Sequence, residues 1–327
     1  MIWREDQLHA VWYAGAPPSL AQRALACLYG GIVRLRGALY RAGILRTQRL
    51  PVPVIVVGNL TVGGTGKTPL TIALVEALRA RGRKPGVVSR GYGGSVAHAR
   101  LLVAESKPGE SGDEPVLVRR ATGVPVAVGR QRVAAARLLL TEGCDTVIAD
   151  DGLQHYALGR DIEICVIDGA RRFGNGSLLP AGPLREPLSR LRSIALRVCN
   201  GGVALGDEIP MSLVGDEAVA MTGSRESIAL TSLVGTRVHA VAGIGNPARF
   251  FTTLRTLGLV VDEHPFPDHH VFVASDFAFG DDAPVLMTQK DAVKCDGFAR
   301  GNFFEVPVRA QLPSSFFESV FAQLIRH

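Results

Sequence analysis

The sequence predicts an α/β fold: a doubly wound, mostly parallel sheet followed by a second, smaller α/β domain, with an amphipathic helix at the N-terminus. Three observations predict it. Short apolar runs rich in valine and isoleucine alternate with helical patterns, as buried parallel strands and their crossover helices do. A glycine-rich turn joins the first of these runs to a helix. The 327 residues are enough for two cores, since one domain commonly has about 100 to 200 residues.

The composition is that of a globular protein in a reducing compartment. Hydrophobic residues make up 47% of the chain and charged residues 20%, which leaves little room for long disorder. The cysteines lie far apart, form no C-x-x-C pair and are odd in number, so we expect neither a disulfide framework nor a zinc knuckle. They are Cys27, Cys144, Cys165, Cys199 and Cys295. We expect no nucleic-acid partner and no obligate protein partner.

The N-terminal segment, residues 1–48, contains a basic amphipathic helix. Its apolar residues recur at spacings of three and four and fall on one face: Leu25, Leu28, Ile32, Leu35 and Leu39. Its opposite face carries three arginines: Arg23, Arg34 and Arg41. Because arginines interrupt every apolar run, the segment is neither a transmembrane helix nor a signal-peptide core.

Two interpretations of this helix stay open. It either packs on the main domain with its basic face in water, or lies in a membrane interface with leucines in lipid and arginines against anionic headgroups. No acidic residue occurs between Asp6 and Glu76, and this local composition favours the second interpretation.

The run "PVPVIVVGN" (51–59) predicts a buried strand, and "PLTIALVEALRARG" (69–82) predicts a helix that stops at Gly82. Strand, glycine-rich turn and helix in this order predict a phosphate-binding loop of the P-loop NTPase type. Its residues, all candidates for ATP binding, are Thr61, Val62, Gly63, Gly64, Thr65, Gly66, Lys67 and Thr68. Lys67 is expected to hold the β- and γ-phosphates and the Thr68 hydroxyl to bind Mg²⁺.

Thr61 stands where the pattern Gly-x-x-x-x-Gly-Lys-[Ser/Thr] has its first glycine. One interpretation is a different bend that uses Gly58 and Asn59 after the strand. The loop also resembles the G-G-x-G-K-T loop of partition and metal-chaperone ATPases. Those proteins carry a signature lysine before the glycine pair, and Val62 in that position argues against membership.

Two later strands end in aspartate and offer candidate metal ligands. "CDTVIADDGLQHY" (144–156) places Asp150 and Asp151 at a strand end, where a carboxylate reaches Mg²⁺ directly or through water. The sequence does not decide between these two, and a helix cap or a turn is the alternative role. "DIEICVIDG" (161–169) ends in Asp168, a competitor for the same duty. Glu186 is a further candidate ligand.

The long loop that follows Asp168 is rich in arginine. It is either a solvated face or a wall that binds phosphate, for which the planar guanidinium is suited. The candidates for contact with substrate or phosphate are Arg171, Arg172 and Arg185 of this loop, together with Arg90 after the run "KPGVVS".

Transfer of a phosphoryl group to a hydroxyl needs a group that accepts the proton. "SGDEP" (111–115) offers Asp113 and Glu114, and "PDHH" (267–270) offers two histidines. Spacing does not bring these segments together. Only the fold decides whether they meet.

Seven blocks in order closely resemble the tetraacyldisaccharide 4'-kinase family from about residue 20 to residue 310: "VGNLTVGGTGKTP", "GVVSRGYGG", "GDEPVL", "DDGLQHY", "VIDGARRFGNGSLLPAGPLRE", "AGIGNPARFF" and "MTQKDAVKC". The resemblance implies an ATP- and Mg²⁺-dependent transfer of the γ-phosphate to the 4'-hydroxyl of an acylated glucosamine disaccharide 1-phosphate, which forms lipid IV A. It further implies a peripheral protein on the cytoplasmic leaflet of a Gram-negative inner membrane. In this family an aspartate and a histidine work together, here Asp113 and His269, with His270 as the alternative.

We therefore expect an N-terminal membrane-facing segment (1–48), a P-loop kinase domain (49–235) and a smaller α/β domain (236–327). In the last, residues 238–242 are expected to form a strand and 247–257 a helix. The competing hypothesis is a P-loop nucleotide-switch ATPase of the partition or metal-insertion type.

Overall fold

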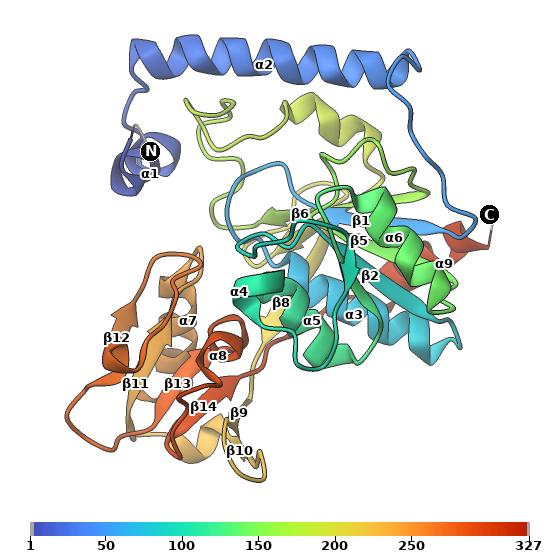
Figure 1. Ribbon diagram of the computed structural model, residues 1–327. Helices are drawn as coiled ribbons and strands as arrows, with labels where there is room; N and C mark the ends of the chain where they lie inside the picture. The colour runs from blue at the N-terminus through green and yellow to red at the C-terminus, as the bar shows by residue number, and fades with distance from the viewer. Residues whose placement is uncertain (1–2, 326–327) are drawn as a thin grey trace.

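A computed structural model describes residues 3–325 and shows two sheets, each flanked by helices (Figure 1). The larger sheet has nine strands within these residues, in the order β15 (Arg309–Gln311), β8 (Ile209–Val214), β7 (Leu196–Asn200), β6 (Ile162–Asp168), β1 (Val54–Gly58), β5 (Thr146–Asp150), β2 (Pro85–Ser89), β4 (Val126–Val128) and β3 (Arg100–Leu101). Only the edge strands β3 and β15 run antiparallel to their neighbours. The predicted doubly wound, mostly parallel sheet is confirmed.

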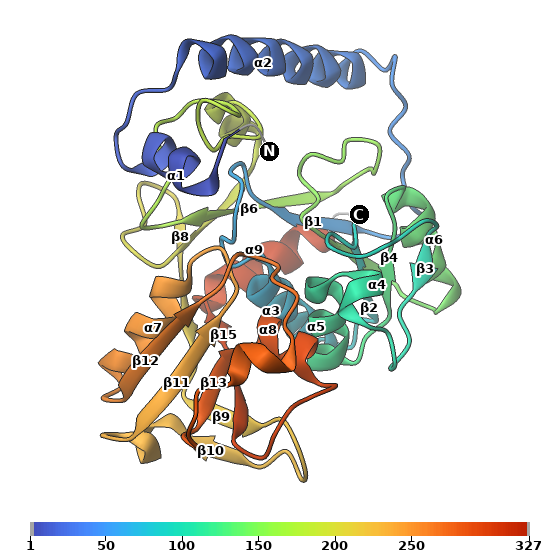
Figure 2. The ribbon, with the colours of Figure 1, turned by 60° about the vertical axis from the view of Figure 1, so that its left-hand side comes forward.

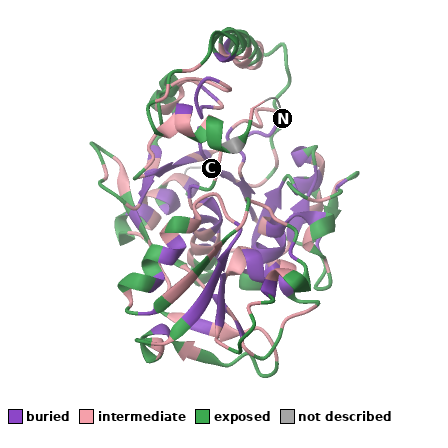
Figure 3. Cartoon of the chain, turned by 90° about the vertical axis from the view of Figure 1, so that its left-hand side faces the viewer, coloured by how far each residue is buried: buried purple, intermediate pink, exposed green. Residues whose placement is uncertain are grey.

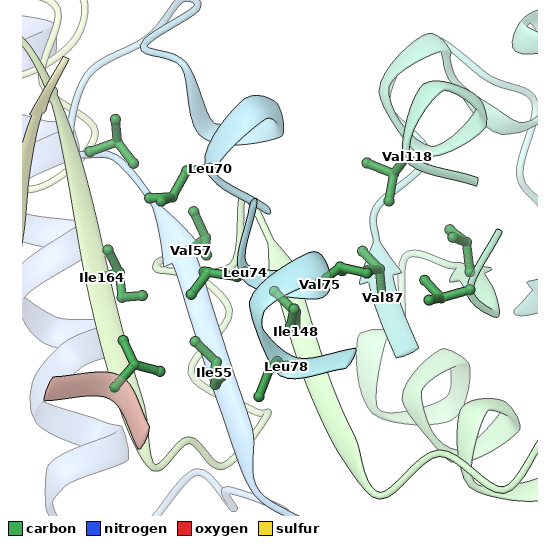
Figure 4. Packing of buried hydrophobic residues seen from close by; sticks show 14 of the residues in the cluster. Ile55, Val57, Leu70, Leu74, Val75, Leu78, Val87, Val118, Ile148 and Ile164 are labelled. Atoms are coloured by element: carbon green, nitrogen blue, oxygen red, sulfur yellow. The ribbon is translucent and has the colours of Figure 1, made fainter. Parts of the chain in front are cut away.

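Both faces of the larger sheet are covered. Helices α3 (Lys67–Ala80), α5 (Asp113–Thr122) and α9 (Ser314–Leu324) pack on one face, and α6 (Arg132–Thr141) with the loops of residues 151–193 on the other. Side chains of β1 alternate between the two cores: Ile55 and Val57 point into the first (Figure 4), Val54 and Val56 into the second. A strand buried on both sides reads as an unbroken apolar run, which is why the sequence revealed it.

The smaller sheet has six strands in the described chain, in the order β10 (Ser227–Ala229), β9 (Glu217–Ala220), β14 (Phe303–Val306), β13 (Val285–Thr288), β11 (Arg237–Ala242) and β12 (Val260–Pro265). Helix α7 (Pro247–Thr256) covers one face, and α8 (Gln289–Cys295) packs on the other and against α5. Short helices complete the chain: α4 (Pro108–Ser111), η1 (Leu188–Ser193), η2 (Leu230–Leu233) and η3 (Ala274–Phe277).

Sheet membership differs from the expected boundary at residue 235. Strands β9 and β10 precede that residue but belong to the smaller sheet, where β10 pairs with β9 and β9 with β14. Strand β15 and helix α9 lie beyond it and return to the larger domain. The return is driven by burial, because Phe316 and Val320 of α9 fill the core beneath α3. Periodicity identifies strands but does not tell which sheet a strand joins. The placement of β9 and β10 in the smaller sheet, and of β15 in the larger one, was therefore not predicted from the sequence.

The N-terminal helices lie along one side of the larger domain (Figures 1 and 2). Helix α1 (Glu5–Tyr13) precedes α2 (Leu20–Arg41). Ser19 is the N-cap of α2, and its hydroxyl accepts a hydrogen bond from the Gln22 backbone N–H. Gln22 and Gly30 are the buried residues of α2, and the Tyr29 hydroxyl donates a 2.8 Å hydrogen bond to the Arg185 carbonyl. The helix therefore packs by a narrow face of small and polar residues.

The leucine face of α2 is exposed, and Figure 3 colours most of this helix as exposed. Leu28 is 62% exposed, Ile32 57% and Leu35 61%. The helix does pack on the domain, but not through these leucines, so packing does not explain the apolar stripe. No helix within residues 3–325 combines the length and apolarity needed to cross a membrane.

Candidate active site

The phosphate-binding loop connects β1 to α3 with two glycines in the left-handed region, Gly63 at φ 99° and Gly66 at φ 92°. Lys67 is buried, and its Nζ lies 3.3 Å from Asn59 Oδ1 and 3.6 Å from Asp151 Oδ1. The amide of Asn59 also donates to the Gly63 carbonyl at 3.4 Å. Asn59 therefore hydrogen-bonds to the loop at both Gly63 and Lys67. From the sequence, only its position after the strand was evident.

Thr61 needs no glycine because the chain there is extended. Thr61 pairs with Leu184 in a β-bridge, and the next N–H, that of Val62, donates to the Pro183 carbonyl at 2.9 Å. The bend expected at Gly58 is absent: this glycine has no positive φ, and a Cβ there would lie 2.7 Å from Leu153 Cγ. Gly58 therefore serves close packing, and segment 183–185 fixes the start of the loop.

Asp150 and Asp151 have different surroundings. Asp150 is buried, and one oxygen accepts a 3.3 Å hydrogen bond from the Thr71 hydroxyl, while Oδ2 has no partner within the described chain. Burial and then the Glu114 charge raise the pKa of Asp150 to about 7, against the opposing charge of Lys67. Asp151 is held by Lys67 and by Arg185 Nη1 at 2.9 Å, and these cations outweigh burial and hold its pKa below the usual value.

The buried, unpartnered oxygen of Asp150 and the equally unpartnered Thr65 hydroxyl fit residues that meet a cation and a phosphate. No group of three His, Cys, Asp or Glu side chains between residues 3 and 325 is arranged to hold a metal alone. That agrees with Mg²⁺, which commonly takes one or two carboxylates and completes its shell with phosphate oxygens and water.

The other candidate carboxylates have structural partners. Asp168 accepts the backbone N–H groups of Ala170 and Arg171, so it caps a turn, the alternative role considered for such aspartates. Glu186 is buried against the Tyr156 hydroxyl and lies 3.2 Å from Gln154 Nε2. No contact in the described chain joins Glu186 to Thr68 or Asp150.

The four candidate arginines have four different surroundings. Arg171 clamps the loop, with Nη2 2.7 Å from the Gly64 carbonyl and Nη1 3.1 Å from the Gly245 carbonyl of the smaller domain. Arg172 pairs with Glu208, with Nη1 2.8 Å from Oε2, and its contact with substrate stays a prediction. Arg185 binds Asp151, and Arg90 is exposed at the end of β2 without a hydrogen bond or ion pair to the described residues.

Residues 113 and 269 meet across the two domains. Asp113 begins α5 and is buried, and its Oδ2 lies 2.9 Å from His269 Nδ1. His269 has φ 62°, a strained value for a histidine, and its ring lies 5.1 Å from that of Tyr92. His270 points instead to Asp276, with Nε2 3.0 Å from Oδ2. The geometry therefore selects His269 over His270.

Lys290 was not anticipated from the sequence. Its Nζ lies 3.2 Å from both Glu114 Oε1 and Asp268 Oδ1, and 3.8 Å from Asp113 Oδ2. Burial raises the pKa of Asp113, but the His269 hydrogen bond and the Lys290 charge outweigh it and bring the value below the usual range. The hydrogen bond to Asp113 raises the pKa of His269 against burial and the opposing Lys290 charge. The pair therefore combines an aspartate whose pKa is lowered with a histidine whose pKa is raised.

Contacts between the domains place this pair beside the phosphate loop. A Cβ on Gly245 would lie 2.9 Å from the Gly64 nitrogen and 3.4 Å from Asp268 Oδ2. Arg249 of α7 reaches from the other side, with Nη2 3.0 Å from Asn200 Oδ1, and the Asn200 amide donates to the Thr65 carbonyl at 2.9 Å. The smaller domain therefore contacts the loop directly at Gly64 and, through Asn200, at Thr65.

A cavity of about 550 Å³ lies beside Asn200, the residue whose amide bonds to the Thr65 carbonyl of the loop. It lies between the ends of β6 and β7 and helix α7, and Asn200, Gly201, Asn246 and Arg249 are among its lining residues. A crevice at the carboxyl ends of parallel strands is where α/β sheets bind ligands.

Gly66→Ala is expected to lower the free energy of unfolding by about 1–3 kcal/mol. The residue has φ 92°, and an added Cβ would lie 2.3 Å from Asn200 Nδ2. Thermal unfolding measures the effect. Gly64→Ala is the control, because it has no positive φ and nothing lies within 4 Å of the added carbon; equal losses in both variants would contradict the argument.

A family model described as Tetraacyldisaccharide-1-P 4'-kinase matches residues 19–326. A protein named Tetraacyldisaccharide 4'-kinase from Methylobacillus flagellatus is 49% identical over 326 residues, 99% of this chain and 96% of the relative. One of the same name from Xanthomonas euvesicatoria is 53% identical over 337 residues, 99% of this chain and 97% of the relative. This chain belongs to the tetraacyldisaccharide-1-P 4'-kinase family.

A solved structure of this family has the same fold. The crystal structure of "apo" form LpxK from Aquifex aeolicus, in complex with ATP, superposes with a TM-score of 0.77 at 29% identity and covers 92% of this chain and 98% of that one. The family consists of phosphotransferases with an alcohol acceptor in lipid A biosynthesis that use ATP and Mg²⁺, and the relatives come from Gram-negative bacteria. The predicted family, fold class, reaction class and cofactors are therefore confirmed.

Proposed function

We propose that this chain transfers the γ-phosphate of ATP to the 4'-hydroxyl of an acylated glucosamine disaccharide 1-phosphate, and that Asp113 and His269 form the proton-accepting pair. The observation that carries this proposal is the 2.9 Å contact of Asp113 with His269 at the edge of the phosphate loop. A kinase needs a carboxylate positioned where the acceptor hydroxyl approaches the terminal phosphate.

The neighbouring residues have distinct roles in this proposal. Lys67 and the N–H groups of the loop bind the phosphates, and Thr68 and Asp150 hold Mg²⁺, which neutralises charge on the phosphate oxygens. Asp151 with Arg185 fixes the Lys67 ammonium. The cavity beside Asn200 receives the base and ribose of the nucleotide, because the reacting end of ATP must point to the opposite side, toward Asp113.

The proposal is tested by incubating the enzyme with ATP, Mg²⁺ and the disaccharide 1-phosphate and analysing the lipid by mass spectrometry with tandem fragmentation. We expect the gain of one phosphoryl group on the distal glucosamine. A phosphoryl group elsewhere on the lipid, or an unmodified lipid with ADP formed, contradicts the proposed acceptor position.

Lys290→Gln is expected to move the acidic limb of the kcat/KM profile to higher pH. The Lys290 charge lowers the pKa of both His269 and Asp113, so its removal raises both. The active pair needs a free proton acceptor, and a higher pKa keeps the proton bound to a higher pH. A limb that stays in place, or moves to lower pH, contradicts this coupling.

We further propose that the protein is peripheral on the cytoplasmic leaflet of the inner membrane and that the exposed leucine face of α2 enters the lipid. Four apolar side chains of this face are at least 41% exposed. They are Leu25, Leu28, Ile32 and Leu35, while Leu39, the fifth residue of the face, is partly buried. The acyl chains of the acceptor then stay near the bilayer while its sugar enters the site.

The variant Leu28→Gln, Ile32→Gln, Leu35→Gln is expected to weaken partition into lipid vesicles by about tenfold or more and to raise KM for the lipid while kcat is kept. Vesicle sedimentation and micelle kinetics measure these effects. Exposed Val203 and Leu205, remote in sequence from α2, serve as a control pair when changed to Gln. Unchanged partition of the α2 variant would exclude lipid contact by this face.

A further inference from the structure

A second cavity, of about 790 Å³, lies under the inner face of α2. Its roof is a stripe of the helix and its floor comes from the segments around Tyr156 and η1. The α2 residues Val33, Arg34, Gly37, Tyr40 and Arg41 form the roof. The floor includes Tyr156, Arg160, Glu163, Glu186, Arg190 and Arg192. None of these residues belongs to the proton-accepting pair or the phosphate loop.

The helix is held over this cavity at two points. On one side the Tyr29 hydroxyl is bonded to the Arg185 carbonyl, and a Cβ at Gly30 would lie 2.8 Å from Leu178 Cδ1. On the other side the rings of Tyr40 and Tyr156 lie 5.5 Å apart. Between them, at Gly37, nothing lies within 4 Å of an added Cβ. The gap is therefore built into the packing of α2.

The cavity lining is strongly basic. It contains six arginines (34, 41, 49, 160, 190 and 192) and two glutamates, a difference of four positive charges. Glu163 is shared by Arg160, at 2.9 Å, and Arg190, while Arg49 pairs with Asp161 just outside the lining. The guanidinium groups of Arg34, Arg41 and Arg192 have no acidic partner within the described chain, and the Arg190 Nε is buried without an acceptor. Such unpaired donors match a phosphate.

The position of the cavity selects a lipid phosphate. The roof helix carries the leucines that we place in the membrane, so its inner face lies at the depth of the headgroups. Glu186 lines the cavity and contacts Tyr156, and Gln154 links it to the Asp151–Arg185 pair. Its carboxylate disfavours a phosphate that would bridge from the cavity toward the reacting centre.

We propose that the cavity under α2 binds the phosphate of an anionic phospholipid headgroup, separately from the lipid acceptor, and that this contact fixes α2 on the membrane surface. The inference rests on the membrane placement of α2 in the proposed function. Basic recesses beside membrane-facing helices commonly bind anionic headgroups.

Two variants and one control test the cavity: one variant fills it without changing its charge, and the other removes two of its positive charges. Gly37→Phe retains all six arginines and places a ring in the open space. Arg34→Gln with Arg192→Gln removes two unpaired guanidinium groups, and Arg23→Gln with Arg46→Gln removes two exposed arginines that do not line the cavity. Equilibrium sedimentation with vesicles of phosphatidylcholine, alone or with phosphatidylglycerol, gives the partition coefficients, and circular dichroism verifies the helix.

For vesicles with phosphatidylglycerol we expect Gly37→Phe to bind about fivefold or more weakly than wild type. We expect the Arg34→Gln, Arg192→Gln variant to bind about tenfold more weakly than the Arg23→Gln, Arg46→Gln variant, which corresponds to the loss of one charge-assisted hydrogen bond. Binding to pure phosphatidylcholine stays equal among all variants. If both double-arginine variants lose the same amount of binding, or if Gly37→Phe binds as well as wild type, the proposal is overturned in favour of general surface attraction.

Two further measurements separate the source of the phosphate. Inorganic phosphate at millimolar concentration should not displace the enzyme from phosphatidylglycerol vesicles; displacement that is stronger than by chloride of equal ionic strength would show a site for free phosphate instead. In neutral detergent micelles the cavity variants should keep the wild-type KM for the lipid acceptor. A raised KM there would place the acceptor's own phosphate in the cavity and overturn the proposal, while kinase turnover in the same assay tests the proposed function independently.

Discussion

Asp113→Asn is expected to lower kcat by about 10²- to 10⁴-fold while the affinity for ATP changes little. The amide keeps the size of the side chain but accepts no proton. The neighbouring carboxylates Glu114 and Asp268 each lie 3.2 Å from Lys290 Nζ, whereas Asp113 lies 2.9 Å from His269 Nδ1. Steady-state kinetics with the lipid and ATP-binding calorimetry give the two quantities.

Glu114→Gln is the matched control for Asp113. This carboxylate is the next residue of α5 and contacts the same lysine, with Oε1 3.2 Å from Lys290 Nζ, but it makes no contact with His269 within the described chain. A small loss of kcat is expected. If Asp113→Asn retains turnover, or if both variants lose it equally, the proton acceptor lies elsewhere.

Asp150→Asn is expected to abolish tight Mg²⁺·ATP binding and to lower kcat/KM by about 10²- to 10³-fold. The reason is the Oδ2 atom, which is buried and unpartnered and would lose the charge that meets the cation. Calorimetry with Mg²⁺ and an ATP analogue measures binding separately from turnover. Asp145→Asn is the control, because that carboxylate lies at the opposite end of β5 and accepts a 3.2 Å hydrogen bond from Arg83 Nε: it should keep the Mg²⁺ affinity. Equal loss of affinity would contradict the assignment.

The same residue gives a pH dependence. The pKa of Asp150 is about 7 because burial disfavours its charged form, and a metal ligand must be deprotonated. The Mg²⁺ concentration for half-maximal activity should therefore rise as the pH falls below about 7 and be constant above it. In Asp150→Asn this dependence should disappear.

The sequence predicted the elements that are buried on both sides and the motifs at their ends. Strands β1, β5 and β6 and the helix after the phosphate loop were found because their apolar runs are continuous and bounded by glycine or aspartate. The phosphate loop was recognisable although Thr61 departs from the pattern. The physical reason for that departure is the β-bridge between Thr61 and Leu184, which is 123 residues later in the chain. Local sequence does not predict such a contact.

The contacts made by the fold at long range could not be predicted. Lys290, Asn200 and Arg249 reach the site from segments whose local sequence shows only a helix or a strand end. The pairing of Arg172 with Glu208 was likewise not evident from the basic loop, which suggested phosphate contact. The meeting of residues 113 and 269 was an expectation from family resemblance. The fold supplies its geometry, and its role in catalysis stays a prediction.

The central claim is that the two domains form one site for transfer to a lipid hydroxyl and not a nucleotide switch. Val62, whose N–H is used in the pairing with Pro183, stands where switch ATPases carry their signature lysine. The most direct measurement is the fate of the terminal phosphate of γ-labelled ATP in the presence and absence of the disaccharide 1-phosphate. We predict that nearly all label enters the lipid, that little inorganic phosphate forms without it, and that Asp113→Asn suppresses the transfer. Label released chiefly as inorganic phosphate, with or without the lipid, would contradict the account.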